Sequence, residues 1–225
     1  MVLTAKLLRE ADYIVLDNFL PEEDYNKAKT YLYSTEPKWT LLQNVSANKE
    51  DGEIDSRVAD NFGFSSILHT DGENVEKTER RQDVLDIFAQ SLHKYFHIAH
   101  VLRVRAGLQT KTNNINFFHD PHVDLSYPHY TALFYFCTED TGYGVTTIYK
   151  ERHDHYHNPD KMVGWRHEDL TLADSIQPKE NRVLIFKGNV LHSSSPPLDN
   201  SIRIAVNLNF IGYPREESIQ DEQFV

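Results

Sequence analysis

The sequence has a single cysteine, Cys137, and lacks any long apolar run. One cysteine excludes an intramolecular disulfide and fits a reducing compartment. No stretch approaches the roughly 18 consecutive apolar residues of a membrane-spanning helix. The first ten residues, MVLTAKLLRE, also lack the apolar stretch of a secretory signal. We therefore expect a cytoplasmic protein without a membrane-spanning segment.

Positive charge is also scarce, with 23 Lys and Arg against 34 Asp and Glu and a formal net charge of −11. Such a surface repels nucleic-acid phosphates and anionic lipid head groups. No nucleic-acid or membrane partner is expected. A local basic pocket for a small anionic ligand remains compatible with the acidic total, and nothing in the sequence indicates the oligomeric state.

Apolar and aromatic residues are plentiful, at 40 % and 12 %, enough to build a packed core. Residues 12–20 predict a short strand, and a helix follows Pro21, because acidic residues suit the first turn and apolar residues recur at helical spacing. The same spacing predicts a helix over 78–96. The polar stretch 43–60 predicts a loop or an edge hairpin.

The remainder of the chain has the pattern of strands, in short segments rich in aromatic and β-branched residues and separated by Gly, Pro, Asn or Asp. They lie around 100–107, 115–119, 130–137, 144–149, 182–187 and 202–211. This order predicts an α+β, mainly β fold, a β-barrel or sandwich with helices on one side. We expect one domain over 1–225, with a helical support region at 1–98 and the β-barrel core at 99–212.

The densest group of metal-ligand side chains is the segment 119–124, HDPHVD. On an extended chain His122 and Asp124 point to the same side, whereas Val123 points away. A third ligand is expected from His192, which follows an apolar strand and a glycine turn. Two imidazoles and one carboxylate leave part of an iron coordination sphere open, as in non-haem iron(II) oxygenases.

The segment 203–210 alternates completely, with Arg203, Ala205, Asn207 and Asn209 on one face and apolar residues on the other. A strand with one face in water explains this pattern without any site. Alternatively, the guanidinium of Arg203 grips a carboxylate of a metal-bound dicarboxylate. The 11 positions between His192 and Arg203 predict that the two lie on neighbouring strands.

Four ordered motifs connect these residues: HVD at 122–124, TALFYFC at 131–137, GYGVTTIYKE at 142–151, and NRVLIFKGNVLHSSSPP followed by SIRIAVNLNF at 181–210. With them the chain resembles the 2-oxoglutarate/Fe(II)-dependent dioxygenase superfamily, closest to its prolyl-hydroxylase-like branch. The resemblance implies a double-stranded β-helix, the jelly-roll or cupin-like barrel. Two positions depart from the pattern: Tyr143 replaces the second glycine of a Gly-Gly turn, and Cys137 stands where asparagine is common.

Carried over by position, the resemblance implies that His122, Asp124 and His192 are catalytic and hold Fe(II). It implies 2-oxoglutarate binding by Arg203, with Tyr135 and Asn207 as further contacts. The implied reaction is oxidation of a substrate with dioxygen, a hydroxylation that releases succinate and carbon dioxide. The substrate stays open between a protein side chain, an amino acid and a small metabolite.

Two other functions remain in competition. A cupin-like metal enzyme without 2-oxoglutarate predicts no role for Arg203 and an additional metal histidine or glutamate. A non-catalytic β-barrel binding module predicts that the polar face of the last strand meets solvent. A further run, His153, His155 and His157, offers a second metal site in principle, but the turn signal after it favours a solvated loop.

Overall fold

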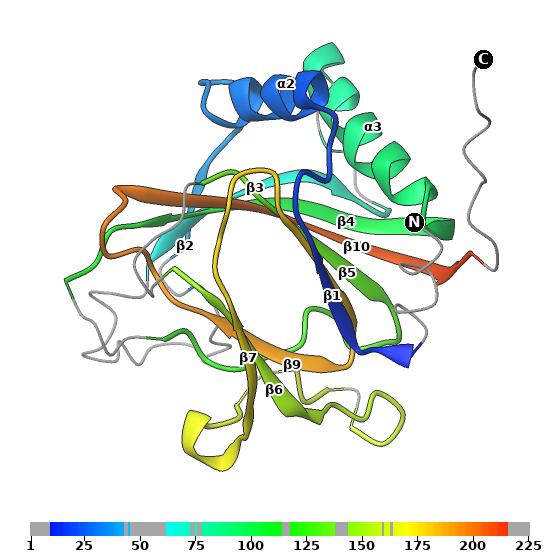
Figure 1. Cartoon of the computed structure of the whole chain (residues 1–225), viewed down its shortest axis with the longest axis vertical. Helices are drawn as coiled ribbons and strands as arrows, with labels where there is room; N and C mark the ends of the chain where they lie inside the picture. The colour runs from blue at the N-terminus through cyan, green and yellow to red at the C-terminus, as the bar shows by residue number, and fades with distance from the viewer. Residues whose placement is uncertain are drawn as a thin grey trace.

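Two antiparallel sheets face each other, and two helices cover the outer side of the larger one (Figure 1). The computed structural model describes residues 10–42, 45, 62–72, 75, 78–113, 118–137, 144–158, 160–162 and 164–215. Within these residues the arrangement is a double-stranded β-helix, which confirms the predicted mainly β, jelly-roll class.

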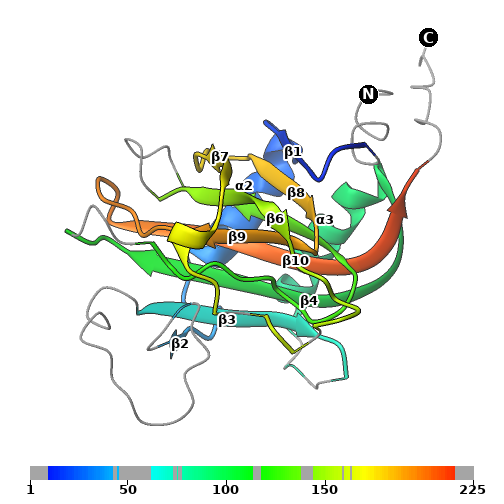
Figure 2. The ribbon, with the colours of Figure 1, turned by 90° about the horizontal axis from the view of Figure 1, so that it is seen from below.

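The larger sheet has seven strands in the order β1-β8-β5-β10-β4-β3-β2. Their bounds are β1 Tyr13–Leu16, β8 Val183–Lys187, β5 Tyr130–Tyr135, β10 Ile202–Pro214, β4 Phe96–Thr110, β3 Gly63–Thr70 and β2 Thr40–Leu42. The smaller sheet has the order β7-β6-β9, with β7 Leu172–Ile176, β6 Thr146–Arg152 and β9 Val190–Ser194. A short 3-10 helix, η2 His167–Asp169, precedes β7. Figure 2 shows the two sheets from a second side.

The helices are α2, Glu22–Leu32, and α3, Glu79–His93, as the apolar spacing predicts. α2 starts directly after Pro21 with three acidic residues in its first turn. α3 is capped by Thr78, whose side chain accepts a hydrogen bond from the backbone of Arg81. It ends three residues before the predicted end, because Phe96 already begins β4.

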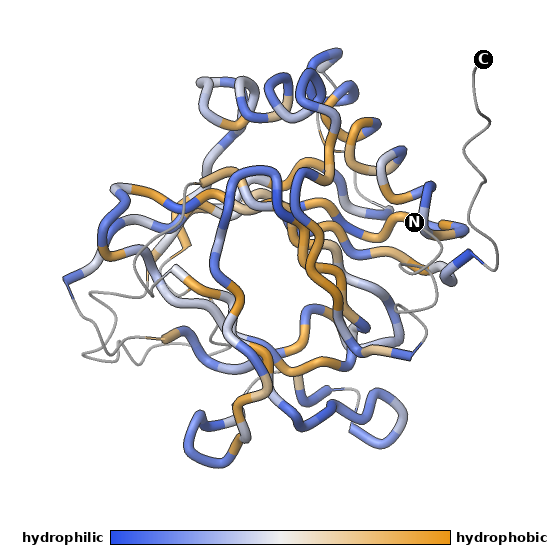
Figure 3. The backbone as a smooth tube through the Cα atoms, in the orientation of Figure 1, coloured by the Kyte–Doolittle hydropathy of each residue, from blue (hydrophilic) through white to orange (hydrophobic). Residues whose placement is uncertain are grey.

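The main core lies between the helices and the outer face of the large sheet. Tyr25 of α2 stacks on Phe136, and Phe88 of α3 contacts Phe134 and Phe136. The outward residues of β10 complete this layer: Ile204, Val206, Leu208 and Phe210. Figure 3 shows apolar residues gathered where the helices meet the sheet. The helices therefore leave the opposite face of the sheet to line the barrel interior.

The N-terminal third contributes more than helices, because β1, β2 and β3 join the large sheet. β3 escapes prediction because a bulge between Ile67 and His69 interrupts its alternation. The predicted strand at 115–119 is not seen at Phe118 and His119, and 114–117 lie outside the described residues. Apart from Val45, so does the segment 43–60. No helix in the described ranges is long and apolar enough to cross a membrane.

Candidate metal centre

The polar face of β10 points into the barrel and not toward solvent. β10 pairs with β5 on one side and with β4 on the other, and its outer face is covered by the helices. The inward side chains are nonetheless buried: Arg203 is 5 % exposed, Asn207 8 % and Asn209 0 %. The solvent explanation of the alternation is therefore wrong, and with it the main expectation of the non-catalytic binding module.

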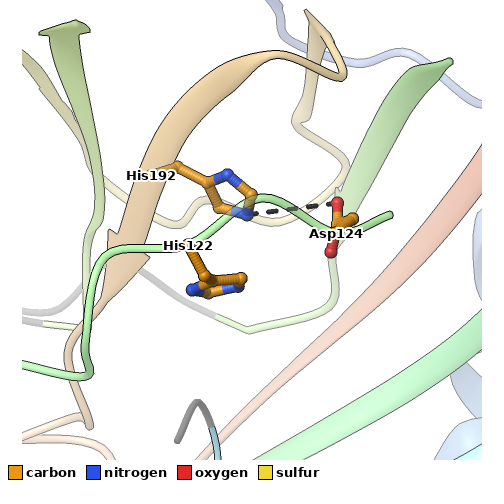
Figure 4. Close-up of side chains that lie close together, drawn as sticks. All are labelled: His122, Asp124 and His192. Atoms are coloured by element: carbon orange, nitrogen blue, oxygen red, sulfur yellow. Dashed lines mark ion pairs between the residues drawn. The ribbon is translucent and has the colours of Figure 1, made fainter. Parts of the chain in front are cut away.

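The predicted metal ligands come together at the centre of this interior (Figure 4). Each of His122, Asp124 and His192 offers one ligand atom, and these atoms all lie within 4.8 Å of one another. His192 Nε2 is 4.0 Å from Asp124 Oδ2, and the two imidazole rings are 4.5 Å apart. Within the described part of the chain no fourth histidine, cysteine or acidic residue joins the group.

Both imidazoles are oriented as metal ligands. Nδ1 of His122 donates to the carbonyl oxygen of Asp120 at 3.0 Å, and Nδ1 of His192 donates to that of Val190 at 3.1 Å. A carbonyl oxygen only accepts, so these contacts fix the proton on Nδ1 and leave the Nε2 lone pair for a cation. Burial, together with His192, lowers the pKa of His122 to about 4, which keeps this ring neutral.

The backbone holds the two histidines side by side. The amide of His122 donates to the carbonyl of His192 at 2.9 Å, and the amide of His192 donates back at 3.1 Å. The amide of His119 donates to Ser194 at 2.8 Å. The segment with the predicted H-x-D motif thus runs along β9, and Val123 points away from the ligands into a small cluster with Tyr149 and Leu191.

Asp124 is held by four side chains. Thr131 donates to its Oδ2 at 2.8 Å, and the amides of Asn207 and Asn209 donate at 3.0–3.1 Å. Arg103 adds a longer contact at 3.4 Å. Burial raises the pKa of this carboxyl, but the neighbouring His192 and Arg103 lower it further, so that it lies well below its usual range. Asp124 is therefore ionised and fixed in place.

Arg203 is buried without a carboxylate partner among the described residues. Its Nη2 donates to Thr146 at 3.0 Å and its Nη1 to Gln109 at 3.4 Å, while the described residues offer Nε no acceptor. The guanidinium also lies over the Tyr135 ring at 5.5 Å. Neutral acceptors orient this cation without neutralising it, which leaves it available to an anion in the cavity.

Gly144 makes the turn beside Arg203. Its φ is +69°, a conformation that favours glycine, and a Cβ there would contact Cδ of Arg203 at 3.7 Å. Gly144 belongs to the motif at 142–151, of which Tyr143, the predicted departure, lies outside the described residues. The turn leads directly into β6, which presents Thr146 to Arg203.

The two further 2-oxoglutarate contacts predicted from the resemblance lie near Arg203 and Asp124 respectively. Tyr135 is fully buried; its hydroxyl donates to Thr146 at 2.8 Å. Asn207 borders the cavity, and its amide donates to both carboxylate oxygens of Asp124. A contact between Asn207 and 2-oxoglutarate stays a prediction, and the structure adds that Asn207 supports the candidate ligand Asp124.

The spacing of His192 and Arg203 predicts that they lie on neighbouring strands, and this prediction is wrong. His192 is on β9 of the small sheet, whereas Arg203 is on β10 of the large sheet. The connection between them crosses from one sheet to the other, so the two residues face each other across one cavity. Its walls include His122, His192 and Arg203.

β4 contributes a second polar row that sequence reasoning missed. Gln109, Gly107, Arg105 and Arg103 pair with Arg203, Ala205, Asn207 and Asn209 of β10. The alternation in LRVRAGLQT, residues 102–110, is the signal that points to this row. Arg105 lies deep in the barrel on the cavity wall, and burial and the neighbouring Arg103 lower its pKa.

The histidine run is not the solvated loop that the turn signal favours. His153 and His155 are buried and pack edge to face at 4.6 Å, and His129 lies 6.0 Å from His155. His157 alone is exposed, where it contacts Asp154. Within the described residues these rings do not form a second group with metal-binding distances.

The fold agrees with the resemblance read from the motifs. A 2OG-Fe(II) oxygenase-family oxidoreductase from Burkholderia pseudomallei matches with a TM-score of 0.59 and 10 % identity, over 96 % of this chain and 91 % of that one. A prolyl hydroxylase from Trichoplax adhaerens, solved with a peptide fragment, gives 0.57 and 14 %, over 92 % and 87 %. A prolyl-4-hydroxylase from Pseudomonas putida gives 0.52 and 11 %, over 93 % and 97 %.

No protein-family model and no curated protein matches the sequence. The comparisons therefore show a shared fold, and any assignment of function rests on the residues assembled inside the barrel.

Proposed function

We propose that this protein is a 2-oxoglutarate- and Fe(II)-dependent dioxygenase. The observation that supports this most is the buried Arg203, which has no carboxylate partner among the described residues and shares one cavity with His122 and His192. A buried cation without a counter-ion is costly, and a dicarboxylate that also reaches the metal removes that cost. A cupin-like metal enzyme without 2-oxoglutarate gives no reason for this arginine.

The side chains present suit Fe(II). His122 and His192 present Nε2 and Asp124 presents a carboxylate oxygen, a donor set typical of non-haem iron sites. Thr131, Asn207 and Asn209 fix the carboxylate, as the outer partners of metal ligands commonly do. When bound, Fe(II) and 2-oxoglutarate supply the chemistry by which dioxygen hydroxylates a substrate, with release of succinate and carbon dioxide.

The chain's own groups position the co-substrate and limit water. Thr146 and Gln109 hold the guanidinium of Arg203 toward the cavity, where it binds the distal carboxylate. Apolar side chains, among them Leu133 and Ala205, form part of the cavity wall. The substrate is a small molecule or a peptide side chain that reaches the open side of the metal.

Binding measurements test this proposal without knowledge of the substrate. Mn(II), which stands in for oxygen-sensitive iron, and 2-oxoglutarate are titrated by calorimetry into wild type, Asp124→Ala and Arg203→Met. Asp124→Ala is expected to abolish metal binding. Arg203→Met is expected to weaken 2-oxoglutarate about 10- to 100-fold, the value of charged hydrogen bonds, while Mn(II) affinity stays within about twofold.

Arg182→Met is the matched control, since Arg182 is a partly exposed arginine paired with Asp17. It should leave both affinities unchanged. Unaltered 2-oxoglutarate binding in Arg203→Met would falsify the assignment and favour a metal enzyme of another class.

A further inference from the structure

Arg105 is a second cation in the same cavity, and the proposed reaction does not use it. We propose that its guanidinium binds a carboxylate or phosphate group of the substrate that is oxidised, next to the metal. The inference rests on the proposed function and names the substrate class: a molecule with an anionic group close to the oxidised position.

The strand register places Arg105 at the metal end of the cavity. On β4, Arg105 pairs with Asn207, whose amide holds the metal ligand Asp124. Gln109, four residues farther along β4, pairs with Arg203. Four residues of a strand span about 13 Å, so the two arginines serve different ends of the cavity. Arg105 therefore lies where a substrate must approach, and Arg203 where the distal carboxylate lies.

Arg105 differs from its two neighbouring arginines in its partners. Arg103 contacts Asn209 and Asp124, and Arg203 contacts Gln109 and Thr146. Throughout the described ranges, no hydrogen bond or ion pair engages the guanidinium of Arg105. Its side chain is deep in the barrel yet partly accessible, because it borders the cavity. The guanidinium of Arg105 is therefore available to bind an anionic ligand in the cavity.

The charge balance of the loaded site points the same way. Fe(II) carries two positive charges and 2-oxoglutarate two negative ones. Binding of both therefore leaves the net positive charge of the site's arginines and Asp124 unchanged. Arg203 then faces the distal carboxylate. Asp124, whose charge also acts on Arg105, carries a single negative charge and already faces the metal and Arg103. The described cavity wall contains no Asp or Glu to neutralise Arg105. We therefore expect the substrate, as the third molecule in the site, to supply the anionic group that pairs with Arg105.

The probes are acetate, inorganic phosphate and uncharged acetamide, added to protein loaded with Mn(II) and 2-oxoglutarate without iron. Paramagnetic relaxation of the acetate and acetamide methyl protons and of the phosphate ³¹P nucleus reports binding close to Mn(II). We expect saturable relaxation with acetate, phosphate or both, and none with acetamide. The arm that responds identifies the carboxylate or the phosphate as the recognised group.

Arg105→Met should weaken the responding anion about tenfold or more, because a charged hydrogen bond is lost, and leave 2-oxoglutarate within about twofold. Arg105→Lys should keep part of the anion affinity. Arg80→Met removes an arginine whose side chain is 71 % exposed, and should change nothing. If Arg105→Met fails to bind Mn(II), its fold is disturbed and the lysine variant decides, through its weaker anion binding.

Three results overturn the inference: no anion binds the loaded wild type, acetamide binds as well as acetate, or the Arg105 variants keep full anion affinity. A loss of 2-oxoglutarate affinity in Arg105→Met equal to the loss of anion affinity would assign Arg105 to the co-substrate instead. Failure of wild type to bind Mn(II) or 2-oxoglutarate contradicts the proposed function itself, so the two failures are distinguishable in the same samples.

Discussion

The two faces of β10 show how one strand serves both stability and binding. Its outer residues, such as Val206 and Phe210, are fully buried against apolar neighbours and the helices. Its inner residues Arg203, Asn207 and Asn209 are also buried but polar, and they hold Asp124 or face the cavity. Apolar burial stabilises the fold, whereas buried polar groups add little and are retained where they serve a site. Substitutions on the two faces should therefore act on different quantities.

The largest effect is expected on the outer face. Phe210→Ala removes a ring that contacts Phe96 and Tyr130, at 5.0 and 5.7 Å between centroids. Unfolding in urea should show a loss of about 3–5 kcal/mol, typical of a deleted buried phenylalanine. Mn(II) affinity, measured where the variant is folded, should stay near the wild-type value. A large loss of metal affinity with unchanged stability would contradict the division between the faces.

A smaller effect is expected next to the inner face, on the metal alone. Thr131→Val keeps the shape of the side chain and removes the hydroxyl that donates to Asp124 at 2.8 Å. Mn(II) affinity should fall about 10- to 100-fold, as for other outer partners of metal ligands.

Thr147→Val is the control for Thr131→Val, because Thr147 is a buried threonine on β6 that does not line the cavity. It should leave Mn(II) affinity unchanged. Equal calorimetric affinities for wild type and Thr131→Val would show that Asp124 needs no such support.

The smallest effect is expected on the pH dependence of stability, through the ion pair between Arg182 and Asp17 near the surface. Arg182 and Lys179 hydrogen-bond Asp17 and lower its pKa from 3.8 to about 2. A lowered carboxyl pKa contributes stability above pH 4, and the contribution is lost as pH falls from about 4 to 2. Since Asp17 is partly exposed, solvent screening limits it to less than about 1 kcal/mol.

Urea unfolding of wild type and Asp17→Asn between pH 2 and 7 measures this term. The two curves should differ at neutral pH and converge toward pH 2. Arg203→Met, by contrast, removes a buried cation that no carboxylate of the described residues pairs, and should leave stability unchanged or slightly raised. A clear loss of stability in Arg203→Met at neutral pH would mean that Arg203, like Arg182, stabilises the fold through a charge partner.

Much of the site was predictable, because a strand has a strict two-residue period. The alternation in 203–210 identified the inner face of β10, and H-x-D with His192 pointed to the three side chains that the structure brings together. The same period in 102–110 marks Arg103 and Arg105, yet two arginines on a strand equally suit a solvent-facing row. Only the pairing with β10, some hundred residues away in the chain, places them inside.

The parts of the fold that escaped prediction lack that period or depend on long-range pairing. β7, with the sequence LADSI, is a mostly exposed edge strand with a polar sequence. β9 is short and follows a two-residue turn, so it reads as a continuation of β8. That close sequence connection conceals the change of sheet that sets His192 opposite Arg203. Spacing along the chain indicates which residues are candidate site residues, and the strand register determines which of them lie close together.

The reciprocal amide hydrogen bonds between His122 and His192 have a consequence for the thermodynamics of metal binding. Together with the bond from His119 to Ser194, they attach the ligand segment to β9 as if it were a further strand. Preorganisation of this kind removes the entropic penalty of ordering a loop around the ion. The amide protons of His122 and His192 should accordingly resist hydrogen exchange in the metal-free protein almost as well as in the loaded one.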